Sequence, residues 1–161
     1  MTSIDNVQSE EIVTTGHSRD WLYIASLVLV AIGIFISGYL SYVKLTETQT
    51  VCISGGSFNC EVVQSSRYAT LFNVPIAYLG LATYLVLAAL LLLQNRVPFL
   101  REYGVMIQFG IILFAFLFSV WLVYLQAFQL KAFCVWCLSH ELTMTLLFLV
   151  SIPRLKRSLT T

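Results

Sequence analysis

The sequence has very few charged residues: Asp, Glu, Lys and Arg make up 11% of the 161 residues, and the formal net charge is +1. Hydrophobic residues make up 58%, and the mean hydropathy is +0.84. So little charge cannot cover the surface of a soluble domain, and it provides no basic face for nucleic acid. We therefore expect an integral membrane protein that is surrounded by membrane lipid and binds no nucleic acid.

Three other features are missing. No glycine-rich dinucleotide-binding fingerprint occurs, so a nicotinamide cofactor is not implied. No segment alternates apolar and polar residues with a period of two, as strands would. The first residues carry Asp5, Glu10 and Glu11 where a secretory signal would be basic, and no small-residue cleavage site follows the first apolar run. We therefore expect the first apolar segment to be retained.

Long apolar runs are what the sequence does contain. Four are long enough to cross a bilayer, which takes about 20 helical residues: 21–42, 74–93, 103–126 and 133–152. Because a backbone in lipid must satisfy its own hydrogen bonds, we predict an all-α protein, a bundle of four transmembrane helices. Its expected parts are a cytoplasmic, disordered tail, the four-helix membrane domain and a basic cytoplasmic tail: 1–19, 20–152 and 153–161.

The basic residues near the ends of the runs predict an orientation. Six lie on the side of the two termini: Arg19, Arg96, Arg101, Arg154, Lys156 and Arg157. Three lie on the other side: Lys44, Arg67 and Lys131. The excess places both termini in the cytoplasm and the long first loop, 43–73, outside it. We expect a multi-pass protein of the cell (inner) membrane, with Arg154 as part of a topological anchor.

The first cysteine pair, Cys52 and Cys60, lies in this loop, on the predicted oxidising side. The paired glycines Gly55 and Gly56 between them allow the loop to turn back on itself, so the two sulfurs could meet. Residues 61–66 have amphipathic character and predict a short helix that caps the bundle. A static structural disulfide remains the alternative for this pair.

The second pair, Cys134 and Cys137, completes the set of four cysteines and opens the fourth apolar run on the same predicted side. A helix N-terminus and the nearby Lys131 favour a thiolate here. A C-x-x-C spacing is typical of redox motifs, and together the two pairs predict a dithiol relay. A tetrathiolate zinc site is the other interpretation, but seven residues between Cys52 and Cys60 fit poorly with the usual spacing of zinc ligands, so we predict no metal.

Beyond its cysteines, the chain resembles the vitamin K epoxide reductase family over roughly residues 20 to 152. The resemblance rests on C-x7-C in the first loop, Ser-Ser-Arg at 65–67, the segment YATLFNVPIAYLG at 68–80 and C-x-x-C at the fourth helix. The similar DsbB-type proteins carry the two cysteine spacings in the reverse order. Prokaryotic members of the family oxidise a thioredoxin-fold dithiol protein and reduce a quinone, so the resemblance implies the same cofactor and partner here.

The resemblance also implies a role for each sulfur. Cys52 would exchange with the partner, Cys60 would pass electrons to Cys134, and Cys137 would face the quinone. Ser66 and Asn73 match family positions thought to shape the quinone pocket, although a loop serine and a helix N-cap would be ordinary roles for them. Where animal members have Thr-Tyr-Ala, this chain has His-Glu-Leu at 140–142, which argues against epoxide reduction.

Glu141 lies four residues after Cys137 and should share its helix face. A carboxyl group at this depth is costly unless it is functional or paired, so we predict that Glu141 hydrogen-bonds to the quinone or donates a proton to it. An interfacial carboxylate at the helix N-terminus is the alternative. Gly33 and Ser37, also four apart, predict close helix packing.

Three other functions remain open from the sequence alone. A tetraspan structural protein with a static loop disulfide would explain Cys52 and Cys60 but not a second pair on the same side. A small transporter could use Glu141 as its coupling carboxylate and would not need the cysteines. Vitamin K epoxide reduction in the strict sense is a further alternative to disulfide formation.

Overall fold

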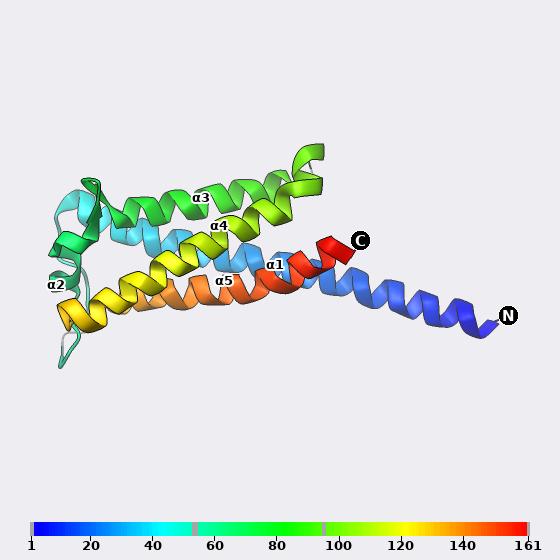
Figure 1. Cartoon of the computed structure of the whole chain (residues 1–161), viewed down its shortest axis with the longest axis horizontal. Coiled ribbons are helices and arrows are strands. Elements are labelled where there is room, and N and C mark those ends of the chain that lie inside the picture. The colour runs from blue at the N-terminus through cyan, green and yellow to red at the C-terminus, as the bar shows by residue number, and fades with distance from the viewer. Residues whose placement is uncertain (1, 53–54, 95, 161) are drawn as a thin grey trace.

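Four long helices run beside one another in the computed structural model, which describes residues 2–52, 55–94 and 96–160, with side chains from Trp21 onward (Figure 1). The long helices are α1 (Thr2–Thr46), α3 (Ile76–Leu93), α4 (Pro98–Leu125) and α5 (Val135–Thr160). The tail predicted for 1–19 falls outside the described side chains, and its disorder stays a prediction. The predicted all-α four-helix bundle is confirmed.

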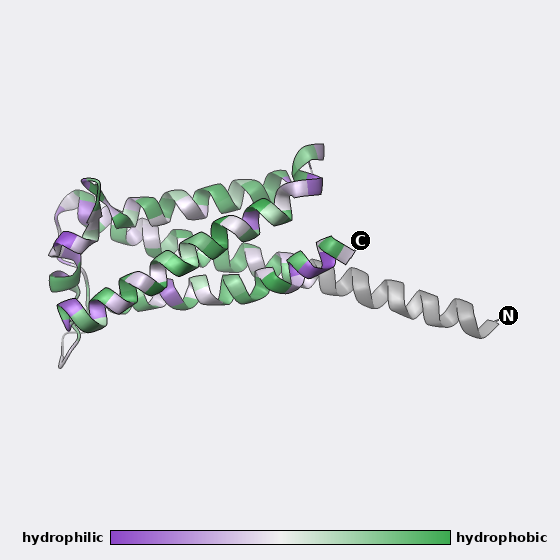
Figure 2. Ribbon diagram, viewed as in Figure 1, coloured by the Kyte–Doolittle hydropathy of each residue, from purple (hydrophilic) through white to green (hydrophobic). Residues whose placement is uncertain are grey.

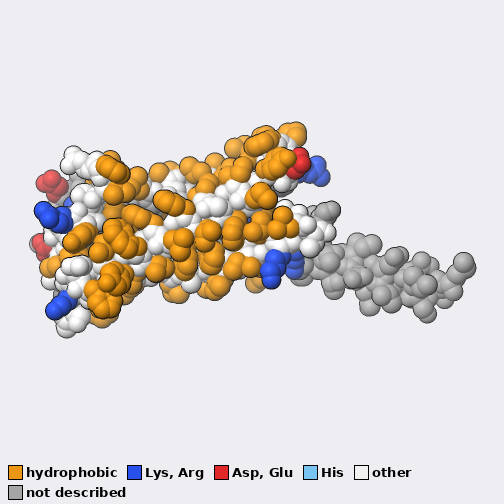
Figure 3. Space-filling model, viewed as in Figure 1, with side chains coloured by type: hydrophobic (Ala, Val, Ile, Leu, Met, Phe, Trp, Pro, Cys, Tyr) orange, Lys and Arg blue, Asp and Glu red, His pale blue; other side chains and the backbone are white. Residues whose placement is uncertain are grey.

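Four helical segments of the described residues are long and apolar enough to span a membrane: Trp21–Thr46, Ile76–Leu93, Pro98–Leu130 and Val135–Thr160. The third continues five residues beyond the end of α4. Hydrophobic residues predominate along the middle of the helices (Figure 2), and on the face that Figure 3 shows the charged side chains lie at the two ends of the bundle. Large side chains such as Phe35 and Phe114 are about 70% or more exposed on this apolar surface, which suits lipid better than water. The structure therefore supports a multi-pass membrane protein, whose orientation stays a prediction.

The second and third spans do not begin where the sequence predicted. Residues 70–75 form a hairpin, in which β1 (Thr70–Leu71) pairs with β2 (Val74–Pro75), so α3 starts at Ile76. Phe72 and Asn73 form its two-residue turn with φ values of 51° and 66°, as a tight hairpin requires. Asn73 is therefore a turn residue and not the N-cap of α3. Pro98 starts α4 earlier than predicted, because proline fits the first turn of a helix.

The core of the bundle forms around Tyr84, whose side chain is 0% exposed. A side chain at Gly33 on α1 would overlap the Tyr84 ring on α3. Ser37, one turn further, donates a hydrogen bond to the Gly33 carbonyl at 2.6 Å. The close helix packing predicted from these small residues is confirmed.

Arg154 links four helices at the end of the bundle opposite the cysteines. Its helix, α5, continues through Pro153 to Thr160, beyond the predicted boundary at 152. The Arg154 guanidinium donates to Ser26 Oγ at 3.1 Å, and to Gln108 Oε1 and Gln94 Oε1, both at 3.4 Å. The side chain thus points into the bundle, where it satisfies polar groups between helices, and its part in a topological anchor stays a prediction.

The opposite end, which we call the cysteine end, carries the long first loop (Figure 1). A short helix, α2 (Cys60–Ser65), lies in this loop and confirms the predicted capping helix. Its N-cap is Asn59, whose Oδ1 accepts a hydrogen bond from the Val62 backbone at 3.2 Å. A single 3-10 turn, η1 (Arg67–Ala69), leads into the hairpin, and a π-helical turn, η2 (Gln126–Leu130), follows α4.

Candidate functional site

The structure brings all four cysteines together at the cysteine end. Cys60 and Cys134 are buried, at 2% and 0% exposure, in one cluster with Val63 and Ala132. Cys52 and Cys137 pack against this cluster. Cys60 and Cys134 are 74 residues apart in the sequence, yet they share one small apolar site.

Within this site the two pairs differ in redox state. A disulfide joins Cys52 and Cys60, whose Cα atoms are 6.2 Å apart, whereas Cys134 and Cys137 are free thiols. The loop turns between its two cysteines through Gly56, with φ +60°, and the Phe58 amide donates to the Gly55 carbonyl at 3.2 Å. The turn predicted from the glycine pair is confirmed.

The loop is fastened directly to the segment that precedes Cys134. The Phe133 amide donates to the Ser57 carbonyl at 2.9 Å, and the Asn59 amide donates to the Phe133 carbonyl at 3.0 Å. The indole N–H of Trp136 donates to the Val51 carbonyl at 2.8 Å. These hydrogen bonds therefore hold each loop cysteine near the C-x-x-C motif, so exchange between the pairs needs only local motion.

Cys134 is the activated thiol of the site. A hydrogen bond from the Cys137 thiol lowers the pKa of Cys134 from 9.0 to about 7, against the opposing effect of burial. The backbone N–H groups of Cys137 and Trp136 and the Gln64 amide also favour the thiolate. The predicted helix-terminus effect is therefore present as these first-turn amides, whereas Lys131 is exposed in a left-handed conformation at the end of η2.

Gln126 is a residue of this site that the sequence analysis missed. Its buried side-chain carbonyl accepts a hydrogen bond from the Cys134 amide at 3.2 Å. The available signal was a polar residue at the end of an apolar run, but this position was interpreted only as the end of the third span. Its contact fixes the backbone at the start of the C-x-x-C segment.

We expect Cys137→Ala to change the titration of Cys134. Alanine has no hydrogen-bond donor in its side chain, so the loss of the Cys137 contact should move the Cys134 pKa from about 7 towards 9.0. The wild-type protein should therefore lose thiolate absorbance as the pH falls through 7, and the variant should already have lost most of it at pH 8. Replacing Cys134 by serine identifies the titrating group, and coincident wild-type and Cys137→Ala curves would contradict the assignment.

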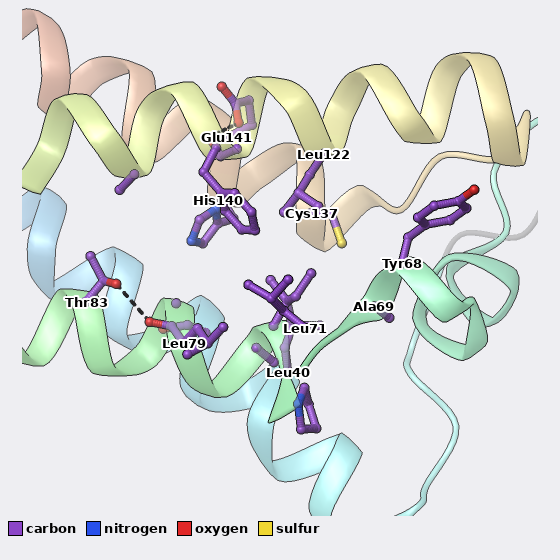
Figure 4. A pocket seen from close by; sticks show the side chains of 18 of the residues that line it. Leu40, Tyr68, Ala69, Leu71, Leu79, Thr83, Leu122, Cys137, His140 and Glu141 are labelled. Atoms are coloured by element: carbon purple, nitrogen blue, oxygen red, sulfur yellow. Dashed lines mark hydrogen bonds between the residues drawn. The ribbon is translucent and has the colours of Figure 1, made fainter. Parts of the chain in front are cut away.

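A cavity of about 580 Å³ lies beside the cysteines, with walls from α1, α3, α4 and α5 and with η1 at its cysteine end (Figure 4). Helices α3 and α4 diverge towards this end (Figure 1). The size lies within the range of roughly 300–1,000 Å³ that is usual for small-molecule sites. The wall is mostly apolar and includes Leu40, Leu79, Val86, Phe114, Phe118, Leu122 and Met144.

Three of the residues predicted to meet the quinone line this cavity, and one does not. Cys137, Ser66 and Glu141 are lining residues, and the sulfur of Cys137 points into the space (Figure 4). The Ser66 hydroxyl is used locally, since it donates to the Val63 carbonyl at 2.7 Å. Asn73 is exposed in its hairpin turn and is not among the described residues of the wall.

Glu141 has polar partners on two helices. Ser119 of α4, a buried residue, donates a hydrogen bond to Glu141 Oε2, and the Thr145 hydroxyl lies 3.4 Å from Oε1. The carboxyl group is therefore turned towards α4 (Figure 4). The sequence could not identify Ser119, because nothing in the third span marks which of its faces meets Glu141.

The family comparison agrees with this geometry. Residues 24–152, well over half of the chain, match the Vitamin K epoxide reductase family. The chain is also similar to thiol-disulfide oxidoreductase LTO1 of Arabidopsis thaliana, with 30% identity over 125 residues that cover 74% of this chain and 33% of the plant protein. The chain thus spans about a third of the length of that relative. From the extent of the family match we conclude that this chain belongs to the vitamin K epoxide reductase family.

Proposed function

We propose that this protein is a membrane thiol–quinone oxidoreductase of the prokaryotic, disulfide-forming type. It takes electrons from an extracytoplasmic thioredoxin-fold dithiol protein and passes them through two cysteine pairs to a quinone. The observation that carries the proposal is the packing of both pairs in one buried cluster beside an apolar cavity. Similarity to a plant protein named a thiol-disulfide oxidoreductase supports it.

The exchange between the pairs follows from their chemistry. After the partner has reduced the loop disulfide, the Cys60 thiolate attacks Cys134 in a Cys134–Cys137 disulfide, and Cys137 leaves as a thiolate. Cys52 then attacks Cys60, restores the loop disulfide and releases Cys134. A thiol with a pKa of about 7 leaves readily. The observed state, with Cys52–Cys60 joined and Cys134 and Cys137 free, is the product of this exchange.

The cavity fits a quinone in its chemistry and size. Its walls are mostly apolar, and the Cys137 sulfur points into it. A bound quinone would supply a two-electron, two-proton acceptor. Cys137 would lie against the ring, Ser66 would help to shape the wall, and the apolar side chains of α3 and α4 would exclude water.

Glu141 is proposed to take part in proton transfer at this cavity, with Ser119 and Thr145 holding its carboxyl group. Glu141→Gln keeps the shape of the side chain and removes the exchangeable acid. We expect the variant to lower quinone turnover and to alter its pH dependence, measured in the reconstituted assay with saturating partner. Unchanged turnover and an unchanged pH profile would assign Glu141 to packing alone.

The partner would meet the loop at Cys52, which is half-buried next to exposed apolar residues. Val51 is 78% exposed and Phe58 40% exposed, so this end of the bundle offers an apolar contact surface beside the disulfide. We propose that the loop faces the extracytoplasmic side of the cell membrane and that both termini lie in the cytoplasm, as the distribution of basic residues predicts.

The function is tested by reconstitution of the purified protein in lipid with a reduced thioredoxin-fold protein and a short-chain ubiquinone. We expect one quinone to be reduced for each partner disulfide formed. The static-disulfide alternative predicts no quinone reduction. A transporter predicts transport activity that survives replacement of all four cysteines, and either result would overturn the proposal.

A further inference from the structure

His140 presents its ring to the same cavity as Cys137 (Figure 4). The two residues lie three apart on α5 and therefore share a helix face. His140 thus lies about one helical turn deeper in the bundle than the sulfur of Cys137. Nothing in the family comparison or in the proposed relay assigns it a role.

Apolar and aromatic groups hold the His140 ring in place. Its edge meets the ring of Tyr84, with centroids 5.4 Å apart and an interplanar angle of 79°. On α3, a Cβ atom at Gly80 would lie 3.4 Å from His140 Nε2, so the absence of a side chain at Gly80 makes room for the imidazole. The ring is fixed by packing, but none of the hydrogen bonds among the described residues involves its nitrogens.

Three other polar side chains in the wall already have hydrogen-bond partners. The Thr83 hydroxyl donates to the Leu79 carbonyl at 2.8 Å, as Figure 4 shows, and Ser66 donates to the Val63 carbonyl. The Glu141 carboxyl accepts from Ser119. An imidazole with unused hydrogen-bonding capacity in an apolar cavity is costly unless a ligand or water satisfies it.

We infer that His140 is the direct hydrogen-bond partner of a ring oxygen of the acceptor bound in this cavity. The inference rests on the proposed quinone function and deepens it. A neutral imidazole has one N–H donor and one acceptor nitrogen. The N–H can donate to the carbonyl oxygen of an oxidised ring, and the other nitrogen can accept from the hydroxyl of a reduced ring. His140 can therefore serve both forms, whereas the Glu141 carboxyl, also on α5, is held towards α4 by Ser119.

The test measures binding without turnover. In a Cys137→Ser background, where the Cys134–Cys137 disulfide cannot form, short-chain ubiquinone is titrated calorimetrically into protein in lipid nanodiscs. His140→Phe keeps a ring against Tyr84 but removes both nitrogens, and it should weaken binding by about three- to tenfold, the range expected for one hydrogen bond. His140→Gln, which retains a donor and an acceptor, should recover part of the loss.

Thr83→Val is the matched control, because it removes a cavity hydroxyl that is already bonded to its own helix. It should bind the quinone as the parent does. Equal binding by His140→Phe and the parent would overturn the inference, as would a loss in Thr83→Val as large as that in His140→Phe. His140→Leu tests the same point if the larger Phe disturbs Gly80.

Failure of the inference can be told apart from failure of the proposed function. With Cys137 present, His140→Phe should raise the KM for quinone, while single-turnover reduction of its loop disulfide by the partner stays at the wild-type rate. If His140→Phe fails this partner reaction, it is misfolded. The quinone affinity of His140→Gln, compared with that of the parent protein, then tests the inference. If the wild type itself neither binds nor reduces quinone, the proposed function is overturned, and the role of His140 with it.

Discussion

Replacing Cys134 by serine is expected to stop the coupling of partner oxidation to quinone reduction. Cys134 is the buried thiol that packs with Cys60, so no other described thiol can pass electrons from the loop pair to Cys137. The steady rate should fall by about a thousandfold or more, to the uncatalysed background. The partner should still reduce the Cys52–Cys60 disulfide, so each protein molecule should oxidise one partner and then stop.

The measurement is partner oxidation followed by thiol labelling, with quinone reduction recorded in the same sample. Ser139→Ala is a suitable control, since its hydroxyl lies in the same first turns of α5 and donates only to the Val135 carbonyl, at 2.9 Å. This control should turn over at nearly the wild-type rate. Sustained turnover by Cys134→Ser would mean that electrons reach the quinone by a route that bypasses the C-x-x-C pair.

Substitution of Gly33 by alanine is expected to destabilise the bundle. The added methyl group would overlap the ring of Tyr84, which is 0% exposed and cannot move aside without disturbing the core. Overpacking of this kind typically costs about 1–3 kcal/mol. The variant should unfold at a lower denaturant concentration or temperature than the wild type, measured by circular dichroism in the same detergent.

Gly38 provides the control on the same helix, since a Cβ atom there meets nothing within 4 Å. Gly38→Ala should be as stable as the wild type or slightly more so, because alanine is the better helix former. If both variants lost the same stability, the loss at Gly33 could not be assigned to the Tyr84 contact, and the prediction would be wrong. Displacement of Tyr84 should also disturb His140, whose ring packs against it.

Much of the fold could be predicted because the membrane restricts the choices. Apolar runs of the right length specify four helices, and the short loop helix follows from its amphipathic pattern. The hairpin at 70–75 was missed, because Phe72 gives no signal for the left-handed conformation that it adopts. Consequently Asn73, expected at the mouth of the second span, was placed in the wrong local structure.

The site was predictable where it depends on sequence spacing and not where it depends on packing. Four cysteines in two spaced pairs identify a relay, and the structure brings them into one cluster. The partners of polar groups inside the bundle come from other helices. Ser119 is hydrogen-bonded to Glu141, and Gln126 is hydrogen-bonded to the Cys134 amide. Arg154 is hydrogen-bonded to residues of three helices. The local sequence gives no sign of any of these contacts.

The central claim is that electrons cross from one cysteine pair to the other through a bond between Cys60 and Cys134. With Cys52 and Cys137 both replaced by serine, the two remaining thiols should form this bond on mild oxidation, since they already share one buried cluster. Mass spectrometry of the digested protein should then find the two peptides joined within one chain. Two thiols that stay free, or that join only between different chains, would contradict the relay.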